Sequence, residues 1–396
     1  MRRTTLAMLA LCAALAGCGG ATKLLIRSAP VVGENVTGPQ NLDLGIPALA
    51  TKNTTRVSGA DPVADAAGVA LAVYPSSAPG THPPAVVLAP TDDWEAAIAA
   101  SVLMAPPIRA PILLSGAGSL PTATAQALSK LAPTGSAAGG QVIRIGDVPS
   151  PPGLRSATIS GSDPYSLAAA IDRFASAAAG KESPDVVIAS ADQPSYAMPA
   201  AGWAAESGDP VLFVDRSGVP AATGQALLSH QNPHIYVLGP PSVIPDSVLA
   251  QLRKYGTVAR VGAVHPAANA VAFAVYRDPP CTFGQPCAHV PGSFGWAMRS
   301  PGHGYVLINA GRPLDAAASA ALSSSGDYGP QLLLGNAGAL PTSVLNFFLN
   351  YATPGYTQEG PTAAVYNHAW VIGDQSAISV PVQAEVDSLL EVVPQK

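Results

Sequence analysis

Short apolar segments alternate with longer segments of mixed polarity along most of this chain. Strands of a parallel sheet are buried on both faces, so they form continuous apolar runs rather than a strict alternation. The segments between these runs are long enough for helices, and the pattern therefore predicts an α/β fold built from β-α-β units. The predicted strands lie at residues 86–90, 111–115, 141–146, 186–190, 210–214, 235–239, 305–309, 331–335 and 369–373.

A recurring segment divides the chain into three repeats. Its copies are Arg56–Pro62, Thr158–Pro164 and Arg260–Pro266, whose prolines are 102 residues apart each time. A period of this length marks units large enough to be small layered domains. We call this segment the start motif and expect it to form the first strand and turn of each repeat. The predicted repeats, each with about four strands, are residues 53–155, 156–256 and 257–396.

The N-terminal residues have the pattern of an export signal. Arg2 and Arg3 precede an apolar run that is too short to span a bilayer as a mature helix. The run ends in Leu15-Ala16-Gly17-Cys18, which resembles the bacterial lipobox. This resemblance implies cleavage before Cys18, a diacylglyceryl group on its sulfur and attachment to the outer face of the cell membrane. Residues 1–17 are then a signal peptide and residues 18–52 a tether, whereas the alternative is an ordinary signal peptide with an incidental cysteine.

The composition limits the classes of partner that the protein can bind. The chain is 48% hydrophobic and 11% charged, and its net charge is −5. Cleavage after residue 17 removes two arginines and no acid, which leaves 18 basic and 25 acidic residues and a charge of −7. This balance, without a basic stripe, argues against nucleic acid as a partner. No later stretch reaches the ~18 apolar residues of a membrane-spanning helix.

Two cysteines lie in an insertion within the third repeat. Cys281 and Cys287 belong to residues 277–303, a segment without a counterpart in the other repeats. In an exported protein two nearby cysteines favour a disulfide. The alternative is a metal site with His289 or His303, for which the four ligands of a tetrahedral zinc site are only scattered. The sequence therefore predicts a disulfide, no metal and no cofactor.

The order of motifs resembles the cell wall-binding repeat 2 family of bacterial surface proteins. The start motif, the strand Pro111-Ile112-Leu113-Leu114 and the endings Val237-Leu238-Gly239 and Val371-Ile372-Gly373 follow the family pattern. The resemblance implies three tandem Rossmann-like or flavodoxin-like parallel-sheet repeats in a pseudo-threefold arrangement, packed together in one monomer. It also implies non-covalent binding to anionic cell-wall polymers. The residue after the start-motif Asp or His is proline in every copy, where the family has a basic residue.

Two groups of residues are candidates for polymer binding. Arg56 and Arg260 occupy one repeat position, which Thr158 fills in the second repeat, and a guanidinium can pair with anionic groups. The alternative is internal pairing with Asp61 or with an acid of another repeat. The glycine turns at Gly118, Gly218 and Gly338 follow buried strands and could hold a phosphate at a helix N-terminus. Their alternative is a tight strand-to-helix turn.

Catalytic motifs are absent from the sequence. It contains neither a Gly-x-Ser-x-Gly elbow nor a Cys/His dyad. Asp92, Asp93 and Glu95 are better explained as helix-capping residues than as acid catalysts. His230 and His234 have i,i+4 spacing, but Pro233 prevents a shared helix and argues against a metal pair.

The sequence therefore predicts a non-enzymatic, lipid-anchored surface protein that contacts wall glycopolymers. The alternatives are a solute-binding lipoprotein of a transport system, and an envelope enzyme with a site between repeats.

Overall fold

The computed structural model describes residues 49–137, 139–280, 292–356 and 364–394. The signal peptide, Cys18 and most of the tether lie outside these ranges, as do Cys281 and Cys287. Lipidation at Cys18 and the disulfide therefore stay predictions. Within the described residues, no helix combines the length and the apolar character needed to cross a membrane.

Three separate parallel sheets confirm the predicted α/β fold class. The first sheet has the order β4-β3-β5-β6, with β3 (Val86–Pro90), β4 (Ile112–Ser115), β5 (Val142–Ile145) and β6 (Ser156–Ile159). The second has the order β10-β9-β7-β8, with β7 (Asp185–Ser190), β8 (Val211–Val214), β9 (His234–Leu238) and β10 (Thr257–Val261). The third has the order β1-β2-β14-β11-β12, with β1 (Leu49–Ala50), β2 (Thr54–Val57), β11 (Gly304–Asn309), β12 (Gln331–Leu334) and β14 (His368–Ile372). Only β1 pairs antiparallel in these sheets.

The start-motif strands do not begin the sheets of their own repeats. β6 pairs with β5 and β10 pairs with β9, so each start strand adds the last strand to the sheet that precedes it. β2 pairs with β14 near the other end of the chain, where Thr55 faces Trp370 and Arg56 faces Val371. This finding corrects the expectation of a first strand. The sequence period gives the length of the repeat, but it does not say which sheet a strand joins.

Helices connect and cover these strands. They are α1 (Pro62–Val73), α2 (Trp94–Ala99), η1 (Ala100–Met104), α3 (Thr122–Leu131), α4 (Pro164–Ala179), α5 (Pro194–Ala197), α6 (Pro199–Ser207), α7 (Ala221–Ser229), α8 (Asp246–Leu252), α9 (Pro266–Ala274), α10 (Pro313–Ser323), α11 (Thr342–Phe347), η2 (Phe348–Ala352) and α12 (Val380–Leu389). Two short strands, β13 (Gly355–Tyr356) and β15 (Val393–Pro394), pair with each other.

The Asp-Pro end of the start motif is a helix N-terminus. The carboxylate of Asp61 accepts a hydrogen bond from the Ala64 amide at 2.9 Å, and Pro62 is the first residue of α1. Asp163 forms a capping box with Ser166 at the start of α4. Asp is a favoured N-cap, and proline suits the first helical position because its missing amide hydrogen would have no partner there. This explains why the dipeptide returns in two of the repeats.

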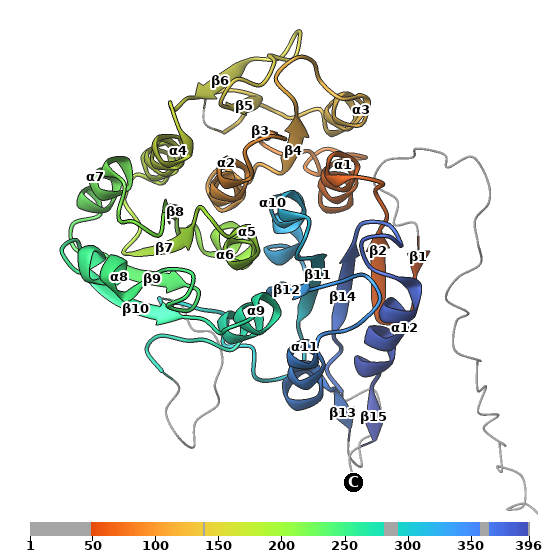
Figure 1. Ribbon diagram of the computed structural model, residues 1–396. Helices are drawn as coiled ribbons and strands as arrows, with labels where there is room; N and C mark the ends of the chain where they lie inside the picture. The colour runs from red at the N-terminus through yellow and green to blue at the C-terminus, as the bar shows by residue number, and fades with distance from the viewer. Residues whose placement is uncertain (1–48, 138, 281–291, 357–363, 395–396) are drawn as a thin grey trace, which may run out of the picture.

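Small residues let helices from different repeats approach one another. Helices α1, α2, α6 and α10 lie in the middle of the molecule, between the three sheets (Figure 1). Their buried faces are largely alanine, and Gly202 of α6 lies against Ser323 of α10. A Cβ atom on Gly202 would lie 2.6 Å from the Ser323 hydroxyl oxygen. The repeats therefore share a core, whereas their pseudo-threefold arrangement stays a prediction.

The close approach at Gly202 makes a measurable prediction. Gly202→Val should lower the free energy of unfolding by about 1–3 kcal/mol, because α6 and α10 must move apart to hold the side chain. The matched control is Gly335→Val, since a Cβ there meets no atom within 4 Å. The control should change the free energy by less than about 0.5 kcal/mol in urea denaturation. Equal effects of the two substitutions would contradict this account of the packing.

Candidate functional site

Arg56 lies inside the protein. Its side chain on β2 is among the largest fully buried ones, and the residue is 2% exposed. Nε donates to Gln383 Oε1 at 2.8 Å, and Nη1 donates to the carbonyl oxygens of Gly373 and Asp374 at 2.8 and 3.0 Å. Burial lowers the pKa of Arg56 to about 10, against the opposing effect of Asp374 and Asp65. This placement favours the internal role over polymer binding, with carbonyl groups of the third repeat as partners rather than Asp61.

Arg260 holds the corresponding turn of the second sheet. Nη1 donates to the Gly239 carbonyl at 2.7 Å, and Nη2 donates to the Ile244 carbonyl at 2.8 Å. A further bond to Asp246 Oδ1 measures 2.9 Å. Gly239 and Gly373 are the glycines of the two Val-x-Gly endings, and both have a positive φ that favours glycine. Each arginine therefore fixes the turn that follows the strand next to its own.

The first sheet obtains the same interaction from a different strand. Thr158 takes the arginine position on β6, but Arg144 stands directly opposite on β5. Its Nε donates to the Val148 carbonyl at 2.8 Å, and Nη1 donates to Thr158 Oγ1 at 3.2 Å. The turn after Gly146 is thus held by a guanidinium as well. A comparison of equivalent repeat positions in the sequence does not find this arginine, because Arg144 lies on the neighbouring strand, opposite Thr158.

The three glycine turns lie where the sequence predicted them, between a strand and a helix. The Gly218 amide donates to Asp215 Oδ1 at 3.0 Å, and the Gly338 amide donates to Asn336 Oδ1 at 2.9 Å. These amide hydrogens therefore have acceptors within the turn, which favours the tight-turn interpretation over a phosphate cradle. Around Gly118 a Cβ atom would meet nothing within 4 Å. Polymer binding at these turns stays a prediction.

A cavity of about 260 Å³ lies between the first and third repeats. It sits beyond the carboxyl ends of β3 and β11, where the N-termini of α1, α2 and α10 meet. Ligands of α/β sheets bind at this edge of the strands. The lining residues are Pro62, Thr91, Asp92, Trp94, Gly311, Arg312, Pro313 and Leu314. The sequence did not identify Trp94 or Arg312 as candidate site residues, although each follows the end of a buried strand by a few residues.

Arg312 joins the cavity to a buried pair of carboxylates. Its Nη2 lies 2.6 Å from Asp65 Oδ2 and its Nε 2.8 Å from Asp315 Oδ2. Both carboxylates are fully buried, whereas the arginine side chain is 18% exposed. Burial and the negative charge of Asp315 raise the pKa of Asp65 to about 8, and burial raises the pKa of Asp315 to about 7. One guanidinium therefore serves two carboxyl groups, of which one keeps a proton near neutral pH.

The aromatic wall of the cavity is fixed by its neighbours. Trp94 meets Phe213 of the second repeat edge to face, with ring centroids 5.8 Å apart. At the start of the same helix, Asp93 Oδ1 accepts from the Ala96 amide at 2.8 Å, which confirms the capping role predicted for Asp93. Burial raises the pKa of Glu95, on the same helix, to about 7. The cavity thus presents a rigid indole beside Asp92 and Arg312.

A family of known proteins matches the middle of the chain. Residues 158–249 match a family model described as cell wall binding domain 2. The predicted family resemblance is confirmed. The match begins at Thr158, on the start motif, although β6 belongs to the preceding sheet. None of the curated proteins matches this chain.

Solved structures share the fold over most of the chain. Cwp8 from Clostridium difficile aligns with a TM-score of 0.63 and 15% identity, over 86% of this chain and 52% of that protein. Cwp6 from Clostridium difficile aligns with a TM-score of 0.62 and 17% identity, over 91% of this chain and 51% of that protein. The chain therefore spans about half the length of these two structures. At this identity the likeness shows the fold alone.

The buried and half-buried arginines should differ in their effect on stability. Arg56→Met should lower the free energy of unfolding by about 3 kcal/mol, because it leaves buried carbonyl groups without a donor. Arg260→Met should cost about 1 kcal/mol, since the Arg260 side chain is 19% exposed and its partner Asp246 is 77% exposed. Urea denaturation of both variants measures the difference. A larger loss for Arg260→Met than for Arg56→Met would contradict the structural role of Arg56.

The carboxyl pair beside Arg312 predicts a pH dependence. Folding raises the pKa of Asp65 and Asp315 above the value of about 3.9 in an unfolded chain, so the folded state holds more protons. Its stability should then fall as the pH rises from 6 to 8.5, by up to about 1.4 kcal/mol per pH unit for one proton. Asp65→Asn should flatten this slope, because the remaining carboxylate keeps Arg312. Identical slopes in urea denaturation of the two proteins would refute the shared proton.

Proposed function

We propose that this protein is a non-enzymatic cell-surface protein that associates with the cell wall through its repeats. The match to cell wall binding domain 2 supports this function, because the model describes a binding domain and not an enzyme. The fold shared with Cwp8 and Cwp6, over 86% and 91% of this chain, supports further units of this kind outside residues 158–249. The lipobox-like Leu15-Ala16-Gly17-Cys18 supports a lipid anchor that holds the protein at the outer face of the membrane.

The cavity between the first and third repeats is our proposed contact with a wall glycopolymer. The observation that carries this proposal is the position of the Trp94 indole, which packs against Phe213 and lies next to two charged side chains that can form hydrogen bonds, Asp92 and Arg312. Aromatic rings provide rigid apolar surface for the C–H face of a sugar, and carboxylate and guanidinium groups can bond its hydroxyls. Concave sites with apolar walls and a few placed polar groups are typical of small-ligand binding.

Charge favours a neutral sugar segment over an anionic backbone. Arg312 is already paired with Asp65 and Asp315, so it offers no surplus positive charge to a phosphate. Asp92 adds a negative charge to the wall of the cavity, and the chain as a whole carries −5. Like charges across an interface weaken association. We therefore assign the cavity to the sugar part of the polymer rather than to its anionic groups.

Sedimentation with purified cell wall tests this function. The soluble part of the protein should be retained on wall before and after chemical removal of anionic polymers, and soluble neutral polysaccharide from the wall should release it. Trp94→Ala should weaken binding about tenfold or more, as expected for the loss of a central aromatic contact. Leu349→Ala is the matched control, because Leu349 is an exposed apolar residue (54%) outside the cavity.

Each outcome bears on a different part of the proposal. Absence of retention on either wall preparation would overturn the wall-binding function. Retention that disappears with the anionic polymers would overturn the assignment to neutral sugar. Equal binding of Trp94→Ala and the unchanged protein would move the site away from this cavity.

A further inference from the structure

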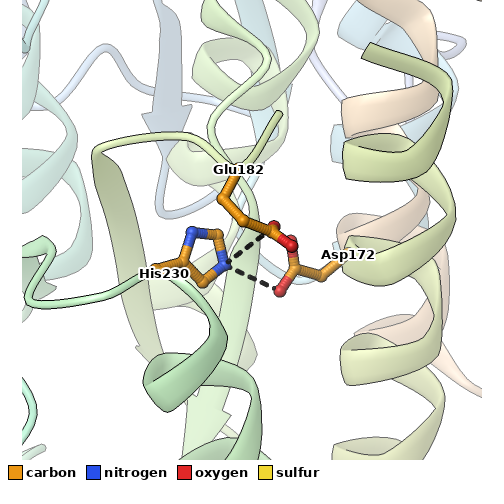
Figure 2. A group of neighbouring side chains, drawn as sticks. All are labelled: Asp172, Glu182 and His230. Carbon is orange, nitrogen blue, oxygen red and sulfur yellow. Dashed lines mark hydrogen bonds and ion pairs between the residues drawn. The ribbon is translucent and has the colours of Figure 1, made fainter. Parts of the chain in front are cut away.

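Three side chains with metal-ligating atoms lie close together in the second repeat. Asp172 comes from α4, Glu182 from the loop after α4, and His230 from the end of α7 (Figure 2). One ligand atom from each residue lies within 4.8 Å of the others. His230 Nε2 is 2.9 Å from Asp172 Oδ2 and 3.9 Å from Glu182 Oε2. Asp172 and His230 are buried, whereas the Glu182 side chain is 36% exposed.

The hydrogen bond on the other ring nitrogen orients His230 toward these oxygens. Nδ1 lies 2.8 Å from the Ser183 carbonyl oxygen, which can only accept, so Nδ1 carries a hydrogen. Nε2 then faces two carboxylate oxygens and lies within hydrogen-bonding distance of Asp172 Oδ2, at 2.9 Å. Either a proton or a metal ion on Nε2 balances the negative charge of these oxygens. Metal-binding histidines commonly donate their second N–H to a carbonyl or carboxylate, which fixes the ring in this way.

Glu182 adds an independent observation. Its Oε2 is buried and is among the side-chain atoms of the described residues that lack a hydrogen-bond partner. A buried carboxylate oxygen without a hydrogen bond is costly. At 3.9 Å the oxygen is beyond hydrogen-bonding distance of His230 Nε2, so a proton on the ring does not satisfy it. A cation bound by all three residues would.

An acidic cavity reaches the cluster. Its volume is about 450 Å³, and Asp172 forms part of its wall together with Asp185, Glu206, Asp209 and Lys181. Asp209 is bonded to Ser183 Oγ at 2.6 Å and Trp203 Nε1 at 2.8 Å, so its carboxylate has other partners. A concave surface with an excess of negative charge raises the local concentration of cations. The cavity also has room for the water that completes the coordination of a metal.

We propose that Asp172, Glu182 and His230 bind a divalent transition metal ion such as Zn²⁺. One imidazole nitrogen and two carboxylate oxygens suit zinc better than calcium or magnesium, which prefer oxygen ligands alone. Bonds of about 2.0–2.2 Å in a tetrahedral site place ligand atoms roughly 3.3–3.5 Å apart. The present separations bracket this value, so small side-chain movements suffice. The fourth position would hold water from the acidic cavity.

The sequence pointed away from this site. It offers His230 only together with His234, and it argues against that metal pair; His234 lies 3.1 Å from Asp185. The true neighbours of His230 are far upstream on α4 and its following loop, where no spacing rule links them to the histidine. The site also differs from the alternative raised for Cys281 and Cys287, because it contains no thiol. It lies within the second repeat and does not depend on the proposed wall-binding cavity.

Zinc titration of the chelator-treated protein tests the proposal. Isothermal titration calorimetry should show one Zn²⁺ bound per chain, and Zn²⁺ should raise the melting temperature, since a ligand of the folded state stabilises it. Co²⁺ should give a visible spectrum without a thiolate-to-metal band. The double variant with Cys281→Ser and Cys287→Ser should bind Zn²⁺ unchanged. Loss of binding in this variant would assign the metal to the cysteines and overturn the proposal.

Glu182→Gln is the decisive variant. It removes one ligand charge at a partly exposed position, so the metal-free fold should survive, as circular dichroism and the melting temperature can show. Its affinity for Zn²⁺ should fall at least tenfold, and His230→Gln should abolish binding. The matched control is Glu206→Gln, which lines the same cavity outside the cluster and should change the affinity less than threefold. Unchanged affinity in Glu182→Gln, an equal loss in Glu206→Gln, or no Zn²⁺ binding by the unchanged protein would overturn the proposal.

Discussion

Each of the three large sheets contains a start-motif strand that belongs to a different repeat of the sequence. β6 and β10 complete the sheets before them, and β2 completes the third sheet from the opposite end of the described chain. A guanidinium group then fixes the turn beside each of these strands: Arg144, Arg260 or Arg56. None of these three sheets is complete within one repeat. The sharing of strands therefore couples the repeats through backbone hydrogen bonds as well as through apolar packing.

The cost of burying polar groups explains how the arginines are used. Arg56 is fully enclosed, and it is tolerated because carbonyl oxygens and Gln383 accept its hydrogen bonds. Arg312 is held by the opposite arrangement, in which two buried carboxylates surround one cation. The first arrangement stabilises a turn. The second leaves part of a guanidinium at a cavity without surplus positive charge, and this is the physical basis for assigning a neutral ligand there.

The two proposed sites use opposite ends of the strands. The sugar cavity lies beyond the carboxyl ends of β3 and β11, where helix N-termini meet. The metal cluster lies near the amino ends of β7 and β8, close to Ser183 and Asp209. The first contains an indole beside charges that are largely balanced, whereas the second contains an imidazole beside excess negative charge. Because the two sites share no residue, substitutions can abolish wall binding and metal binding independently.

The sequence by itself determined the local elements and the repeat length. Apolar runs identified the main strands, and the period of the start motif identified three repeats, of which residues 158–249 match the family model. Only the tertiary structure decided which sheet β2 joins, that Arg144 replaces the arginine missing at Thr158, and that His230 meets Asp172. The reason is that hydrophobic periodicity and capping act over a few residues of the chain. The pairing of Arg56 with Gly373, or of Arg312 with Asp65, depends on how distant segments pack, and no local pattern records that choice.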